Sequence, residues 1–153
     1  MKKICLFLVL MLTGSFVLSG CTKDEILDHY NNIIQSAGSI ELTGNSSLKG
    51  NKETGVDDYT GTYKADYKGF SDTEYLFGGT SIDREAGKEI SVTCTLDVTN
   101  GKAKVFLLSG ADEPIILLET TGTYNDTITL PDGGNYIGIE CDNFTGSIEL
   151  NIE

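Results

Sequence analysis

KEISVTCTLDVTNGKAKVFLLSG, residues 88–110, decides the fold, because apolar and polar residues alternate on both sides of Asn100-Gly101. The apolar positions of its first half are Ile90, Val92, Cys94, Leu96 and Val98. Successive side chains of a strand point to opposite faces, so this alternation predicts strands with one buried and one exposed face. Asn-Gly between two such runs is typical of a two-residue hairpin turn. We therefore predict two strands joined by a β-hairpin.

Similar runs continue on both sides of this stretch. They are residues 59–68 (YTGTYKADYK), 73–82 (TEYLFGGTSI), 114–120 (PIILLET), 125–131 (NDTITLP), 135–141 (NYIGIEC) and 146–153 (GSIELNIE). Clusters of Gly, Asn, Asp and Pro separate several of them, and no helical pattern intervenes. Residues 43–61 are rich in turn formers and are expected to be loop, after a short strand at 39–42. The prediction is an all-β, antiparallel β-sandwich of eight or nine strands over residues 39–153, resembling a jelly roll.

The N-terminus has the layout of a secretory signal peptide. A basic start, Met1-Lys2-Lys3, precedes an apolar run at 4–12 and small residues at 13–20. Leu18-Ser19-Gly20-Cys21 resembles the lipobox of bacterial lipoproteins. The resemblance implies that the chain is cleaved after residue 20 and that Cys21 is acylated, for example with palmitate. An ordinary signal peptide with an incidental cysteine is the alternative. We expect a lipoprotein held on the extracytoplasmic side of a membrane, at the cell surface or the periplasmic face.

Residues 21–38 would then join the anchor to the domain. Apolar residues at helical spacing predict a short amphipathic helix there: Ile26, Leu27, Tyr30, Ile33 and Ile34. Removal of residues 1–20 leaves 9 basic and 23 acidic residues, a net charge of −14. Nucleic-acid binding depends on basic side chains that neutralise phosphates, so nucleic acid is not an expected partner.

Two cysteines, Cys94 and Cys141, fall on the inward faces of their strands. They could form a disulfide if their Cα atoms come within about 7 Å. They could equally remain free as small buried hydrophobic residues. The sequence leaves both outcomes open.

Acidic residues in turn-rich segments are candidate ligands for Ca²⁺, which takes roughly six to eight oxygen ligands. They are Asp57, Asp58, Asp112, Glu113, Asp132 and Asp142, with Asn143 beside the last. None has the spacing of a regular calcium-binding loop, and Asp and Asn also form turns without any metal. Ca²⁺ is the one cofactor that the sequence suggests.

Three tyrosines, Tyr59, Tyr63 and Tyr67, share one face of a predicted strand. An exposed row of this kind could stack against sugars, whereas a buried row would be core. A catalytic grouping is not apparent in the sequence, because the single histidine, His29, precedes the domain. We therefore expect no enzymatic activity.

Several features from residue 60 to the end resemble bacterial pre-peptidase C-terminal-like domains. They are the stretches SDTEYLF, AGKEISVTCTL, AKVFLLSG and TITLPDGGNYIGIEC. The resemblance implies a β-sandwich that accompanies secreted enzymes or surface proteins without being catalytic, sometimes with a calcium-binding or matrix-binding role. We expect a binding or structural module whose partner is a surface protein or a glycan. A small envelope hydrolase or inhibitor-like lipoprotein is the alternative.

Overall fold

A computed structural model describes residues 40–80 and 84–153, and all regular structure among them is β-strand. The strands are β1 (Asn51–Thr54), β2 (Gly61–Phe70), β3 (Thr73–Gly79), β4 (Glu89–Ser109), β5 (Ile115–Leu118), β6 (Gly122–Thr129) and β7 (Asn135–Ile152). Every pairing between them is antiparallel. The predicted all-β, antiparallel fold class is confirmed. The part of the chain that is described contains no helix suited by length and composition to cross a membrane.

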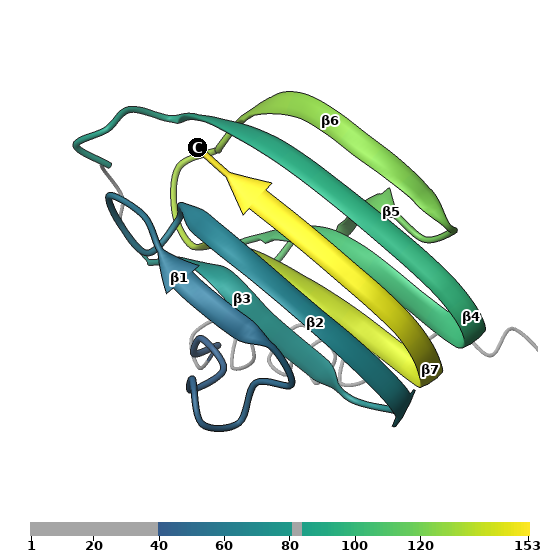
Figure 1. Cartoon of the computed structure of the whole chain (residues 1–153). Coiled ribbons are helices and arrows are strands. Elements are labelled where there is room, and N and C mark those ends of the chain that lie inside the picture. The colour runs from purple at the N-terminus through teal and green to yellow at the C-terminus, as the bar shows by residue number, and fades with distance from the viewer. Residues whose placement is uncertain (1–39, 81–83) are drawn as a thin grey trace, which may run out of the picture. The chain divides into compact units, whose positions relative to one another are not determined.

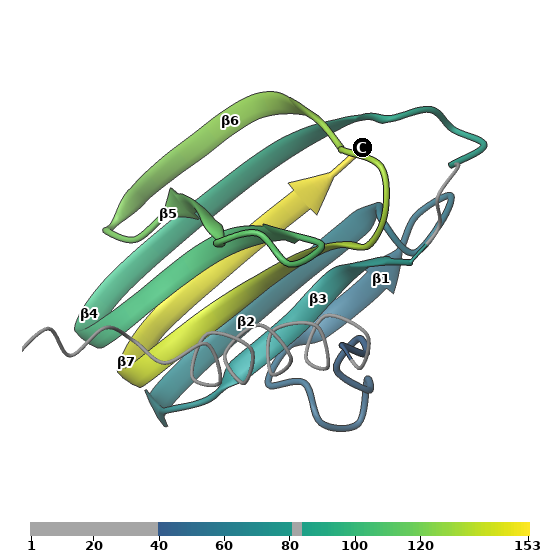
Figure 2. The same cartoon turned by 180° about the vertical axis from the view of Figure 1, so that it is seen from behind.

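β4 and β7 each contribute to both layers of the sandwich. They pair with each other from Val92↔Ile152 at one end to Ser109↔Asn135 at the other. Both bend near the middle, so their two halves lie in different layers (Figure 1). The front layer contains β1, β2, the second half of β7, the first half of β4, and β6. The back layer contains β3, the first half of β7, the second half of β4, and β5, as the reverse view shows (Figure 2).

The predicted hairpin at Asn100-Gly101 is wrong, since the two halves of β4 pair with β7 and not with each other. A two-residue turn of the Asn-Gly type needs positive φ at both residues. Only Gly101 has it, with φ 75°. The backbone of β7 lies against Gly101, because a Cβ there would be 2.1 Å from the carbonyl oxygen of Asn143. The two strands therefore bend together across the sandwich.

The structure has seven strands in its described residues where eight or nine were predicted, because some predicted strands are continuous with each other. The runs at 135–141 and 146–153 form one strand, β7, as the two runs around Asn100-Gly101 form β4. β1 lies within the segment expected to be loop, and residues 40–42 are not in a strand. β1 forms because Asn51 to Thr54 pair with Lys64 to Gly61 of β2, although the sequence NKET has no apolar alternation. The predicted helix at 21–38 lies outside the described residues.

The core lies between the two layers and follows the predicted alternation. Buried and exposed positions alternate along residues 61–68 of β2 and 89–97 of β4. The largest buried side chains include Tyr63, Phe77 and Phe144. The side chains that face inward from the front layer thus pack against those of the back layer, as in other β-sandwiches.

Candidate binding face

The three tyrosines considered for sugar stacking are part of the core. Tyr59, Tyr63 and Tyr67 are 7%, 0% and 4% exposed. Of the two alternatives considered, the structure has the buried row, so these tyrosines do not form an exposed platform for sugars. The physical cause is the one-sided burial of an antiparallel strand, which places this apolar face inward.

Glu74 of β3 lies among these tyrosines and is 2% exposed. Its carboxylate accepts hydrogen bonds from Tyr63 Oη at 2.9 Å, Tyr67 Oη at 2.5 Å and the backbone N–H of Lys49 at 2.8 Å. Burial raises the pKa of both tyrosine hydroxyls, and the Glu74 carboxylate adds to the effect. A buried carboxylate with three donors is a structural element of the core.

Cys94 and Cys141 are buried free thiols. The structure thus has the second of the two outcomes considered, in which they act as small hydrophobic residues. Burial raises the pKa of each thiol from 9.0 to about 12, and the carboxylates of Glu74 and Glu140 contribute at Cys141.

We expect these raised pKa values to make the protein unstable in alkali. Above pH 9 the thiols of the unfolded chain ionise, while those of the folded chain stay protonated up to about pH 12. The unfolded state then binds fewer protons, so stability falls by about 1.4 kcal/mol per pH unit for each thiol. Urea denaturation of the full chain at pH 8 and pH 11 measures this loss. In Cys94→Val, the stability lost between pH 8 and pH 11 should be about 2 to 3 kcal/mol smaller than in wild type. An equal loss in the two proteins would contradict the raised pKa of the Cys94 thiol.

The acidic residues considered for Ca²⁺ are not brought together. Within the described residues, no group of three or more Asp, Glu, His or Cys side chains is placed to hold a metal ion. Asp57 forms a turn: it accepts from the Tyr59 N–H at 3.1 Å and pairs with Arg84 at 2.5 Å. Its partial burial opposes ionisation, but hydrogen bonds from Arg84 and Thr60 outweigh this and lower its pKa. Asp132 pairs with Lys88. The remaining candidates are exposed, as Asp132 is: Asp58, Asp112, Glu113 and Asp142.

The outer face of the front layer is the surface best suited to bind a ligand. Two rows of side chains cross its five strands, from β1 through β2, β7 and β4 to β6. The first row is Glu53, Thr62, Asn151, Thr93 and Asn125, and the second is Asn51, Lys64, Glu149, Thr95 and Thr123. All ten are exposed except Asn151, which is half-buried. We call this surface the polar face. Cross-strand neighbours in such rows lie about 5 Å apart.

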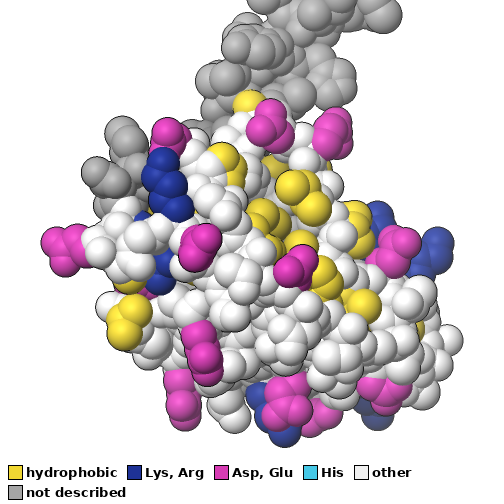
Figure 3. Space-filling view, turned by 90° about the horizontal axis from the view of Figure 1, so that it is seen from above, with side chains coloured by type: hydrophobic (Ala, Val, Ile, Leu, Met, Phe, Trp, Pro, Cys, Tyr) yellow, Lys and Arg dark blue, Asp and Glu magenta, His cyan; other side chains and the backbone are white. Residues whose placement is uncertain are grey.

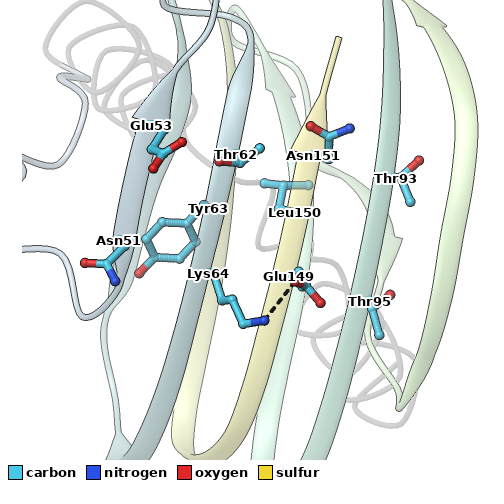
Figure 4. A pocket seen from close by; sticks show the side chains of 10 residues that line it. All are labelled: Asn51, Glu53, Thr62, Tyr63, Lys64, Thr93, Thr95, Glu149, Leu150 and Asn151. Atoms are coloured by element: carbon cyan, nitrogen blue, oxygen red, sulfur yellow. Dashed lines mark hydrogen bonds and ion pairs between the residues drawn. The ribbon is translucent and has the colours of Figure 1, made fainter.

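A hollow of about 550 Å³ lies on the polar face. Figure 4 shows the residues that line it, among them Thr62, Thr93, Thr95 and Asn151. Tyr63 and Leu150 are buried beneath it. The volume falls within the usual range of small-molecule sites, roughly 300 to 1,000 Å³. Hydroxyl and amide groups both donate and accept hydrogen bonds, so the hollow offers both to a polar ligand.

The charged groups of the hollow are poorly placed for acid–base catalysis. Glu149 is held by Lys64 at 2.9 Å, and this pair raises the pKa of the lysine. Glu53 is separated from Glu149 by β2 and lies two positions out of register. Their Cα atoms are therefore about 12 Å apart. Figure 4 shows Glu53 on β1 and Glu149 on β7, with β2 between them.

No protein-family model matches the chain, and no curated protein matches it. Among solved structures, the chain is similar to Drosophila melanogaster CENP-C bound to CAL1, with 11% identity and a TM-score of 0.31 over 84% of this chain and 99% of that one. It is also similar to the C-terminal CBM6 of LamC, a marine laminarinase from Zobellia galactanivorans. That match has 12% identity and a TM-score of 0.28 over 69% and 88% of the two chains.

Sequence reasoning did not identify the polar face, although it assigned the inward side of the same strands. The sequence does contain a pattern that indicates this face: residues with hydroxyl or amide groups alternate with inward-facing ones. Thr93 and Thr95 flank the inward Cys94, and Thr123 and Asn125 flank Tyr124. Their assembly into rows depends on β7 lying between β2 and β4, which is a feature of topology.

Proposed function

We propose that this chain is an exported, lipid-anchored protein of the bacterial envelope whose β-sandwich binds a glycan without catalysis. The polar face carries the proposal, because its hollow combines hydroxyl and amide groups from four strands in one place. Sugars present hydroxyl groups that donate and accept, which matches this set. The pairing of Glu149 with Lys64 supports a binding role over the hydrolase alternative.

A lipid anchor would compensate for weak binding at the polar face. The polar face has no exposed aromatic ring in its two rows, so a glycan would be held by hydrogen bonds alone. A hydrogen bond contributes only about 1 kcal/mol net, so a single site would be weak. Many copies anchored on one membrane would bind a long polysaccharide together and gain avidity. Cys21 acylation is the means of anchoring that we propose.

Replacement of the proposed lipidation site should release the protein from the membrane. Stable attachment requires more than one acyl chain, and an unmodified Cys21→Ala chain would carry none. We expect full-length wild type in the membrane fraction and Cys21→Ala in the soluble fraction. Cys5→Ala, a cysteine within the expected signal peptide, is the matched control and should fractionate as wild type does. If Cys21→Ala stays with the membrane, the anchor is elsewhere.

Glycan binding can be tested on an array of neutral, acidic and amino polysaccharides, using the full chain with Cys21→Ala. We expect retention of at least one class, and about tenfold weaker binding when Thr93 and Asn151 are both replaced by Ala, because one or two hydrogen bonds are lost. Thr127→Ala, exposed on β6 outside the hollow, is the control and should bind normally. Retention of no glycan, or equal binding by the double variant, would contradict the proposal.

A further inference from the structure

The two long sides of the sandwich differ in how they are covered. On the side of β3, residues 40–50 pack along the strand: the Thr43 N–H donates to the Tyr75 carbonyl at 2.9 Å, and the Lys49 N–H donates to Glu74. On the opposite side the layers end at β5 and β6. Each of these two strands pairs only with β4 in the described part of the chain. Their outer edges therefore present backbone groups that can pair with another strand.

Apolar side chains gather along this second side. Ile115 and Ile116 of β5 are 59% and 43% exposed, and both are among the few large hydrophobic residues so exposed in the described chain. The same side includes half-buried apolar residues of β4, β5 and β6 that pack against the core: Val98, Leu117, Leu118, Tyr124 and Ile128. Figure 3, viewed from above, shows hydrophobic side chains together on this side of the molecule. We call this surface the β5–β6 edge. Exposed apolar patches of this kind mark interaction sites.

Acidic residues surround the β5–β6 edge. Asp112 and Glu113 precede β5, Glu119 follows it, and Asp126 lies on β6; all four are exposed. The sequence has no Lys, Arg or His from residue 105 to its last residue, 153, so neither β5 nor β6 carries a basic side chain. Lys104 of β4, one residue beyond the Val105↔Leu118 pair, is the nearest basic residue in the sequence. Acidic side chains around the apolar centre are also visible in Figure 3.

This charge distribution selects among the possible occupants. A second copy of the chain would bring the same acidic residues into contact, and like charges across an interface cost several kcal/mol. An anionic lipid surface would be repelled in the same way. A partner with basic residues would be attracted, both on approach and in the complex.

We propose that the β5–β6 edge binds an extended segment of a partner protein, with aliphatic residues flanked by Lys or Arg, which adds as a strand to β5. Main-chain hydrogen bonds to the open edge would hold the segment, and its aliphatic side chains would cover Ile115 and Ile116. The basic flanks would pair with Glu113 and Glu119. The site is separate from the polar face, so the chain would hold a glycan and a protein at different surfaces.

Two synthetic peptides test this inference. One alternates Val and Thr between Lys pairs, and the other has Glu in place of each Lys. Each is titrated into the full chain carrying Cys21→Ala and followed by isothermal calorimetry. We expect the Lys peptide to bind at least tenfold more tightly than the Glu peptide. The double variant Glu113→Lys/Glu119→Lys should reverse this preference, whereas Glu41→Lys/Glu85→Lys, with the same change in charge, should keep it.

Ile115→Ser/Ile116→Ser should lose at least tenfold in affinity for the Lys peptide while melting within a few degrees of the parent chain. If it fails to fold, the charge-reversal variant still decides the matter. Equal affinity for the two peptides, or a preference that Glu113→Lys/Glu119→Lys leaves intact, would overturn the inference. Self-association or binding to lipid vesicles that disappears in the isoleucine variant would also overturn it, by assigning the edge to a second copy or to a membrane. None of these outcomes depends on glycan binding.

Discussion

Replacement of Gly101 by Ala is expected to destabilise the protein by about 2 to 5 kcal/mol. The residue has φ 75°, a left-handed conformation that costs an alanine free energy, and the new Cβ would lie 2.1 Å from the Asn143 carbonyl oxygen. Strained backbone and overpacking each cost about 1 to 3 kcal/mol. Since β4 and β7 bend together here, relief of the contact would disturb both layers. Urea denaturation of the full chain with Cys21→Ala measures the change.

Gly110→Ala is the matched control for Gly101→Ala. Gly110 also has positive φ, 57°, but nothing lies within 4 Å of the position its Cβ would occupy. Gly110→Ala should therefore be destabilised only by the cost of holding an alanine in a left-handed conformation, about 1 to 2 kcal/mol. If the two variants are equally stable, the close contact between β4 and β7 at the bend does not exist in solution.

Glu74→Ala is expected to cost about 3 to 5 kcal/mol. The change leaves the Lys49 N–H without its acceptor, removes the shared acceptor of Tyr63 and Tyr67, and opens a cavity in the core. Hydrogen bonds to a charged group contribute about 1.5 to 3 kcal/mol each, and a buried unsatisfied donor adds a penalty. The two tyrosine hydroxyls, 3.1 Å apart, can still bond to each other, which limits the loss.

Glu74→Gln separates hydrogen bonding from simple packing. Its amide oxygen can still accept from a tyrosine, so about half of the loss should be recovered. Glu140→Ala, an exposed glutamate on β7, should change stability by no more than about 0.5 kcal/mol. If Glu74→Ala were as mild as this control, the carboxylate would not be part of the core in solution. Denaturant midpoints of the three variants provide the comparison.

Local alternation predicted most of the strands and the inward faces, because one-sided burial repeats every two residues. It placed Cys94 and Leu96 on the core side, where the structure has them. It could not separate a hairpin from a bend at Asn100-Gly101, since both use Gly at positive φ. The choice depends on Asn143 and its neighbours, which are far away in the sequence and provide a matching bend in β7.

The candidate site was less predictable than the fold. Loop acids such as Asp57 were considered as metal ligands, but the ion pair with Arg84 comes from a residue 27 positions away and is not encoded locally. β1 has no apolar pattern and forms only by pairing with β2, so Asn51 and Glu53 were not expected at a sheet surface. Outward residues carry no periodic signal of their own. Their use becomes apparent only when strand order brings Thr62, Asn151 and Thr93 side by side.

Nuclear magnetic resonance tests the proposed glycan-binding face most directly. The full chain with Cys21→Ala, labelled with ¹⁵N, is titrated with the glycan that it retains most strongly on the array. We expect the backbone amides of Thr62, Thr93, Thr95 and Asn151 to shift in a saturable way, while those of Ile115 and Ile116 stay in place. Shifts confined to other surfaces, or no saturable shift at these four residues, would contradict the assignment of the polar face as the binding site.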